Sequence, residues 1–226
     1  SHPIGGISPL TDHGRFCDRQ WSGIGQGESD DPHGGSMQLP TMPYPGPPLR
    51  PGDRARPASP HIVLIGAMGC GKTTIGRLVA ARLGRPFVDN DVALEAATGA
   101  TARRIEEEFG TTDLHRRELG VFGAALRGDQ PAVIAAAASV VDSVTIDDVA
   151  SHLVVYVHCT PPVGARRSIA GRHRPDIRST AQAQARRDRR CRALADMVID
   201  VDELDAVAAA DRIAVVDLTA LSRRLP

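Results

Sequence analysis

Aromatic residues, lysine and long apolar segments are scarce in this sequence, and each scarcity excludes something. Phe, Trp and Tyr make up 3% of the 226 residues, so the core must be built from aliphatic side chains. No segment reaches the roughly 18 consecutive apolar residues that a membrane-spanning helix needs, and we therefore expect no membrane partner. Acidic and basic groups balance at 27 each, so bulk charge predicts no polyanionic partner.

The four cysteines form no C-x-x-C pair, which argues against a zinc cage or a disulfide framework. They are Cys17, Cys70, Cys159 and Cys191. No basic start followed by an apolar stretch resembles a secretory signal peptide. We therefore expect a cytoplasmic protein with reduced thiols.

Composition divides the chain near residue 60. Residues 1–60 contain 11 Pro and 10 Gly, whereas all the residues after them contain 18 of the two types together. Residues 1–60 are therefore predicted to be an extension without a core of its own, and the proline-rich stretch at 44–48 is an alternative partner-binding site. Residues 61–226 are predicted to form one domain.

From His61 onward, short apolar runs alternate with segments of helical periodicity. Runs typical of buried strands occur at 61–65, 86–89, 132–136, 152–158 and 197–200. Apolar residues recur at helical spacing from Ile75 to Leu83, and Gly84 is placed to end that helix. This alternation predicts an α/β domain with a parallel sheet and right-handed crossovers.

The segment between the first predicted strand and the first predicted helix fits G-x-x-x-x-G-K-[ST], the Walker A pattern of a P-loop. Glycines let backbone N–H groups face phosphate oxygens, and the helix N-terminus adds partial positive charge. The lysine reaches the β and γ phosphates, and the next hydroxyl ligates Mg²⁺. We therefore predict an ATP and Mg²⁺ site formed by Gly66, Met68, Gly69, Cys70, Gly71, Lys72, Thr73 and Thr74.

The position of the only lysine supports this interpretation. The chain carries 26 Arg, and its one Lys, Lys72, stands at the lysine position of the loop. At every other position with a lysine or arginine the chain has arginine, so the single lysine indicates a chemical constraint at its position.

Two carboxylates, Asp89 and Asp91, follow the second predicted strand. Ligands of open α/β sheets bind beyond the carboxyl ends of the strands, where alternate residues point the same way. Asp89 is predicted to hold Mg²⁺, and Asp91 to accept a proton from an attacking hydroxyl. The alternative is a pair of solvated acids in a turn.

Together these motifs resemble the shikimate kinases, closely from His61 to about Glu118 and more weakly to about Asp200. The resemblance rests on Gly66 to Thr73, Gly76-Arg77-Leu78, Leu83-Gly84, Phe87-x-Asp89-x-Asp91, Thr98-Gly99 and Gly110. It implies a P-loop NTPase fold of three layers with a five-stranded parallel sheet. It also implies transfer of the γ-phosphate of ATP to a hydroxyl of a small metabolite, shikimate or a related cyclitol or hydroxy acid, beneath a lid.

The resemblance also implies a role for single residues. Lys72, Asp91 and Arg174 match the catalytic residues, and Arg174 belongs to the Arg-Pro pair of the lid. Thr73 and Asp89 match the metal side of the site, and Arg167 matches an arginine that stacks on adenine. The residues that match the acceptor site are Asp91, His115, Glu118, Ala137, Ala138 and Arg187.

Two departures from the family pattern concern the acceptor. His115 stands where the family has an arginine that binds the substrate carboxylate, and losing that contact costs about 1.5 to 3 kcal/mol. Residues 136–138 are alanines where the family has three glycines, so either the loop differs in shape or the pocket is narrower. The alternative function is a catalytically degenerate nucleotide-binding protein with a regulatory or partner-binding role.

Ten arginines and only two aspartates lie between Arg166 and Arg192. A lid that closes over the triphosphate and a solvated helix face both account for such a cluster. A nucleic-acid surface is a third interpretation, but no aromatic residue lies within the cluster to stack on a base. Nucleic acid is therefore an unlikely partner.

The remaining histidines and cysteines are expected to serve the fold, with one exception. His152, His158 and His173 lack metal-ligand spacing and are predicted to be structural or surface residues. Cys159 and Cys191 are predicted to be packing residues. Cys70 lies inside the phosphate loop, where thiolates are favoured, and its alkylation is expected to block nucleotide binding.

Overall fold

A computed structural model describes residues 61–160 and 181–222, so the predicted extension 1–60 lies outside the described residues. The elements, in chain order, are β1 (Ile62–Ile65), α2 (Lys72–Leu83), β2 (Phe87–Asp89), α3 (Asn90–Thr98), α4 (Ala102–Phe109), α5 (Thr111–Leu126), β3 (Val133–Ala135), the 3-10 turn η1 (Val140–Asp142), α6 (Ile146–Val149), β4 (Leu153–His158), α8 (Ala181–Leu194), β5 (Met197–Asp200) and α9 (Ala206–Ser222).

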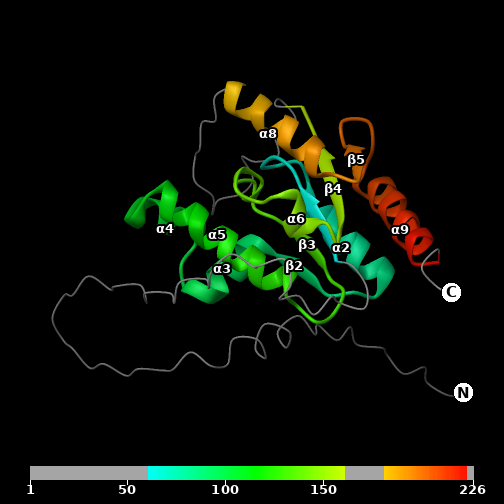
Figure 1. The fold of residues 1–226 in the computed structure, drawn as a ribbon, viewed down its shortest axis with the longest axis horizontal. Coiled ribbons are helices and arrows are strands. Elements are labelled where there is room, and N and C mark those ends of the chain that lie inside the picture. The colour runs from blue at the N-terminus through cyan, green and yellow to red at the C-terminus, as the bar shows by residue number, and fades with distance from the viewer. Residues whose placement is uncertain (1–60, 161–180, 223–226) are drawn as a thin grey trace, which may run out of the picture. The chain divides into compact units, whose positions relative to one another are not determined.

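The strands form one parallel sheet in the order β2-β3-β1-β4-β5 (Figure 1). All five strand-like runs of the sequence are confirmed. β1 lies at the centre, where Val63 pairs with Ile134 of β3 and with Val154 of β4. Because the strands are parallel, their carboxyl ends meet at one edge, and the loop after β1 leaves from the middle of that edge.

Helices cover both faces of the sheet, because alternate strand residues are apolar on both sides. Ile62 and Leu64 point into a cluster with α2 and α9, whereas Val63 and Ile65 point into a second cluster that includes Phe122 of α5. All four strand residues are buried. The predicted three-layer α/β fold is therefore confirmed.

Helix α2 packs very closely on the sheet. A Cβ added at Gly76 would lie 2.4 Å from Cε2 of Phe87 and 3.1 Å from Cδ1 of Leu64, so no side chain fits there without movement. The helix ends as predicted at Gly84, whose φ of 62° lies in the left-handed region. This close packing fixes the start of α2 relative to the carboxyl edge of the sheet.

Helices α3, α4 and α5 enclose a smaller apolar cluster beside β2, centred on Leu94, Ile105 and Leu114. The cluster holds α5 beside α3, and α3 in turn contacts β2. In the described ranges, no helix is long and apolar enough to cross a membrane.

Candidate active site

The loop between β1 and α2 has the backbone of an anion-binding turn. Gly69 and Gly71 have φ values of 77° and 97°, which L side chains rarely adopt. Gly71 caps α2 without any side-chain hydrogen bond to the helix. The N–H groups that begin α2 therefore lie where a phosphate would bind, and the partial positive charge of the helix end favours it.

Lys72 is buried within this loop, and its side chain is 6% exposed. Its Nζ donates to the carbonyl oxygens of Gly66 and Ala67 at 2.9 and 2.8 Å. The ammonium group is therefore held within the loop by two neutral acceptors. An anionic phosphate oxygen is a stronger acceptor than either carbonyl, so this lysine is positioned to bind one.

Thr73 and Asp89 meet beside the loop, as the metal-site prediction requires. The Thr73 hydroxyl donates to Oδ2 of Asp89 at 2.6 Å. A hydroxyl and a carboxylate are hard oxygen donors of the kind that Mg²⁺ prefers, and Mg²⁺ usually takes further ligands from substrate phosphates and water. No cluster of three or more His, Cys, Asp or Glu forms a metal cage within the described part of the chain. The pair therefore fits a Mg²⁺ ion shared with a nucleotide.

Asp91 lies on α3 and not on the strand that carries Asp89. This corrects the expectation that the two carboxylates point the same way because they are alternate residues of one strand. Asp89 ends β2 and caps α3, because its Oδ1 accepts from the Asp91 N–H at 3.0 Å. Asp91 is consequently a half-buried residue in the first turn of α3. The contact between the two residues is therefore a helix cap, made by the Asp91 backbone N–H, and does not come from strand alternation.

The predicted acceptor residues of α5 and of the segment after β3 face one another. Glu118 is buried, and its Oε2 accepts from the Ser139 hydroxyl. The Asn90 side chain donates to the Glu118 carbonyl at 3.3 Å, which ties α5 to the start of α3. Ala137 is buried in the apolar cluster, whereas Ala138 is half-buried.

The three alanines at 136–138 adopt ordinary backbone conformations. Every described residue with positive φ is a glycine. The Ala136 N–H donates to the Leu64 carbonyl at 3.0 Å, and the Ala137 carbonyl accepts from the Val140 N–H at 3.2 Å. The segment therefore forms a regular turn that leads into η1, without the left-handed backbone conformations that glycine favours.

Arg187 has a partner that the sequence did not reveal. Its Nε and Nη2 donate to Oδ2 of Asp142 at 2.8 and 2.7 Å, and both side chains are 27% exposed. Burial lowers the pKa of His115, and the positive charge of Arg187 lowers it further. The negative charges of Asp142 and Glu106 oppose this shift without reversing it. His115 is therefore neutral near pH 7 and adds no positive charge beside Arg187.

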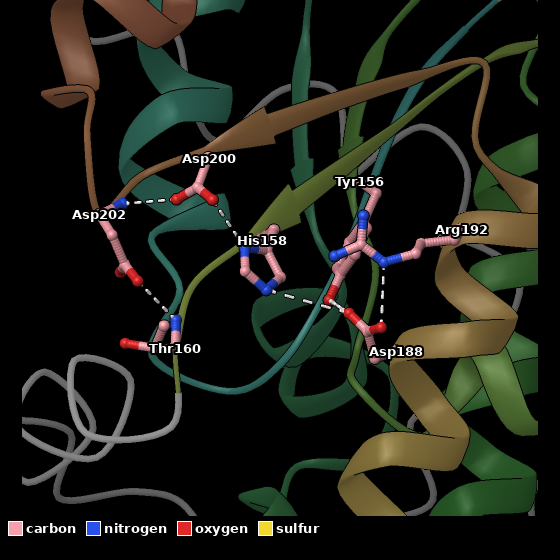
Figure 2. A network of polar contacts seen from close by, with 7 residues as sticks. All are labelled: Tyr156, His158, Thr160, Asp188, Arg192, Asp200 and Asp202. Carbon is pink, nitrogen blue, oxygen red and sulfur yellow. Dashed lines mark hydrogen bonds and ion pairs between the residues drawn. The ribbon is translucent and has the colours of Figure 1, made fainter.

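Other side chains of α8 join it to the sheet through the polar network in Figure 2. The network contains Tyr156, His158, Thr160, Asp188, Arg192, Asp200 and Asp202. Asp188 of α8 accepts from the Tyr156 hydroxyl at 2.8 Å and from Arg192 at 3.0 Å. His158 Nδ1 lies 3.0 Å from Oδ2 of Asp200, at the carboxyl ends of β4 and β5.

These contacts assign part of the arginine cluster to holding α8 in place. Arg190 donates to the carbonyl oxygens of Val141 and Val144 at 2.7 and 3.2 Å. His158 has the structural role that the sequence predicted, and His152 likewise accepts from the His61 N–H. The sequence missed the anchoring partners because they lie tens of residues away in the chain.

Some predicted residues lie outside the described ranges. Arg167 and Arg174, expected at adenine and at the transferring phosphate, are among them, as is His173. Cys159 and Cys191 are buried, as expected for packing residues. Cys70 is also fully buried.

The fold and the loop define a P-loop phosphotransferase of the α/β class. The shikimate kinase family model matches residues 68–216, which is more than half of the chain. The chain belongs to the shikimate kinase family. This confirms the resemblance and the expectation of a phosphotransferase that uses ATP.

Individual relatives agree with this membership. The chain is 35% identical over 161 residues to the shikimate kinase of Methylococcus capsulatus, covering 68% of this chain and 89% of the relative. It is 31% identical over 166 residues to that of Symbiobacterium thermophilum, covering 63% and 94%. The solved structure of Acinetobacter baumannii shikimate kinase in complex with shikimate matches with a TM-score of 0.63 at 28% identity, covering 76% of this chain and 98% of that one.

Proposed function

We propose that this protein transfers the γ-phosphate of ATP to a hydroxyl group of shikimate or of a related cyclitol or hydroxy acid. The observation that carries the proposal is the geometry of Lys72. Its buried ammonium group lies at the start of α2, within hydrogen-bond distance of two loop carbonyls and next to the Thr73–Asp89 pair. Phosphoryl transfer depends mainly on positioning and charge neutralisation, and these residues supply both.

Thr73 and Asp89 would hold Mg²⁺, and Lys72 would exchange the carbonyls of Gly66 and Ala67 for phosphate oxygens. Bound Mg²⁺ supplies neutralisation of phosphate charge. Asp89 already has one oxygen bound to the Thr73 hydroxyl and the other to the cap of α3. This fixed carboxylate supports a metal site that does not need to be reorganised before the nucleotide binds.

Asp91 would orient the acceptor hydroxyl and accept its proton. It lies in the first turn of α3, two residues after the metal-side carboxylate Asp89. The start of α3 is tied to α5 through the Asn90 side chain and the Glu118 carbonyl, so a base in this turn belongs to the same side of the site as the predicted acceptor residues of α5. The contribution of Arg174 at the transferring phosphate remains a prediction from the resemblance.

The acceptor's identity depends on the pair formed by Arg187 and Asp142. Neutral His115 does not offer a second cation, and Arg187 is already bound to a carboxylate of the protein. An acceptor carboxylate would have to compete with Asp142 for Arg187, which favours acceptors whose recognition rests on hydroxyl groups. Shikimate, its neutral esters and carboxylate-free cyclitols therefore form the informative acceptor panel.

ADP release in the presence of each acceptor tests the proposal. Lys72→Ala and Asp91→Asn are each expected to lower acceptor-dependent ADP release at least about a hundredfold, since each removes a group that acts on the transferring phosphate. Arg82→Ala is the matched control, because Arg82 lies at the far end of α2 and pairs with Asp211. Tight ATP binding without acceptor-dependent ADP would instead favour the nucleotide-binding alternative, and substantial turnover in Asp91→Asn would reject the role of Asp91.

A further inference from the structure

Two buried thiols meet behind the phosphate loop. Cys70 belongs to the loop that follows β1, and Cys159 follows β4 directly. β1 and β4 are paired neighbours in parallel register, ending with Ile65 opposite Tyr156, so their next residues leave the sheet side by side. Both residues belong to the same apolar cluster, and the Cys159 side chain is close enough to the Cys70 sulfur to influence its protonation.

Tight backbone packing keeps the loop close to the end of β4. Gly66, the first loop residue, has a φ of 146°, and a Cβ added there would lie 2.4 Å from the Val157 carbonyl oxygen and 3.0 Å from Sγ of Cys70. The loop therefore lies directly against the backbone two residues before Cys159. This contact leaves the two sulfurs little freedom to separate.

The surroundings of the two thiols differ in a way that makes one the nucleophile. Lys72 Nζ lies 3.9 Å from the Cys70 sulfur. The neighbouring Cys159 thiol lowers the pKa of Cys70 against the effect of burial, and the charge of Lys72 lowers it further. The neighbouring Cys70 side chain and burial raise the pKa of Cys159. Cys70 is therefore the more acidic of the two thiols and the better nucleophile, whereas Cys159 keeps its proton.

Cys191 shows that this property belongs to the pair and not to burial in general. It is buried in the cluster on the other face of the sheet, and burial raises its pKa to about 12. It therefore remains a thiol near neutral pH and serves as the matched control.

We propose that Cys70 and Cys159 form a reversible disulfide that switches off nucleotide binding. In the first step a Cys70 sulfur lone pair attacks a peroxide oxygen, so that an S–O bond forms, the O–O bond breaks and hydroxide leaves. In the second step the Cys159 sulfur attacks Cys70, the S–O bond breaks, and water leaves with the Cys159 proton. A dithiol reductant returns both thiols by exchange.

The location of the pair favours one class of oxidant. Cys70 has no exposed surface and Cys159 is 9% exposed. A small peroxide fits this restriction, whereas a bulky disulfide such as oxidised glutathione does not. Cysteine pairs that form disulfides transiently in reducing compartments usually have catalytic or sensing roles.

The disulfide affects the nucleotide because Cys70 sits in the phosphate loop. The new bond draws its sulfur to about 2.05 Å from that of Cys159 and removes it from Lys72. We expect ATP affinity to fall about ten- to a hundredfold, the effect of losing one or two charge-assisted contacts. Conversely, bound phosphates place negative charge beside the Cys70 thiolate, so ATP should slow the oxidation.

Tryptic mapping of the full chain after hydrogen peroxide treatment tests the bond itself. The four cysteines fall on four different tryptic peptides, with Cys70 in 55–72 and Cys159 in 128–166, so one cross-linked mass identifies the pair. We expect this mass with peroxide, its loss after dithiothreitol, less of it when ATP is present, and none of it with oxidised glutathione. Absence of the 55–72 to 128–166 cross-link at full oxidation of Cys70 would overturn the proposal.

Variants separate the switch from general oxidative damage. The ratio of ATP affinity before peroxide to that after it should be about ten or more in the unmodified chain and in Cys191→Ala, but stay near one in Cys159→Ala. The rate of cross-linking should rise with pH and level off at a lower pH than for an ordinary thiol, because the pKa of Cys70 is lowered. A ratio in Cys159→Ala equal to that of the unmodified chain contradicts the switch. The mass of the cross-linked peptides does not depend on phosphoryl transfer, so the disulfide is tested even if the protein shows no kinase activity.

Discussion

Replacing Asp142 by asparagine should release Arg187 for an acceptor carboxylate. In the structure Arg187 makes two hydrogen bonds to a single oxygen of Asp142, at 2.8 and 2.7 Å. An acceptor carboxylate can bind Arg187 only after these contacts are exchanged. Asparagine keeps the shape of the side chain but removes its negative charge, so the competition weakens while the packing of η1 is retained.

The size of the effect follows from the burial of this pair. Both side chains are 27% exposed, so the pair lies between a surface ion pair worth about 0 to 1 kcal/mol and a charged hydrogen bond worth about 1.5 to 3 kcal/mol. A value of about 1 to 2 kcal/mol is therefore reasonable. Since 1.4 kcal/mol is a factor of ten, shikimate should bind Asp142→Asn about 5- to 30-fold more tightly.

Titration calorimetry on the ADP-bound protein measures this change, with shikimate and its methyl ester as paired ligands. The ester lacks the charge, so its affinity should not change in Asp142→Asn. Asp129→Asn is the control, since it removes one exposed acid ahead of β3, at the opposite edge of the sheet. The reasoning is refuted if shikimate binds Asp142→Asn more weakly, because Asp142 would then position Arg187 for the acceptor, or if both ligands shift equally.

Two further predictions concern the stability of the fold. Gly76→Ala should destabilise the protein by about 1 to 2 kcal/mol in urea unfolding, since overpacking against the Phe87 ring outweighs the gain in helix propensity. Gly123→Ala in α5, whose added Cβ finds ordinary contact distances, should instead stabilise it by up to about 1 kcal/mol, and equal effects of the two would contradict the packing. Hydrogen bonds from the Asp202 backbone N–H and from His158 lower the pKa of Asp200. Although burial opposes the shift, hydrogen bonds from Arg192 and Tyr156 lower the pKa of Asp188. Both carboxylates therefore stabilise the fold above about pH 4, and this contribution is lost as the pH falls below that value. The loss of stability with falling pH should be less steep in the double variant Asp188→Asn, Asp200→Asn. An unchanged curve would argue against the network.

Local patterns were sufficient to predict the strands, the phosphate loop and the layer arrangement. Alternating apolar runs and one motif carry that information within a few residues of each position. The position of Asp91 was harder to predict, because Asp89 caps α3 and ends β2 two residues before Asp91. The site's residue types were therefore predictable, while their local geometry depended on capping.

Partners distant in the chain could not be predicted from the sequence. Asp142 reaches Arg187 across 45 residues, and the thiols of Cys70 and Cys159 meet only because β1 and β4 are neighbours in the sheet. If the strand order were known, Cys159 could be placed beside the phosphate loop, since it follows β4, the strand next to β1. No comparable signal marks Asp142, which follows an apolar turn and resembles any other surface acid.

The central claim is that phosphate passes from ATP to a hydroxyl of the acceptor. Phosphorus NMR of the full chain with ATP, Mg²⁺ and the acceptor panel measures this directly, with Lys72→Ala in parallel. The account predicts a new phosphate monoester signal whose amount equals the ADP formed, and its loss in the variant. Release of inorganic phosphate alone, or ATP that stays intact with every acceptor, would contradict it.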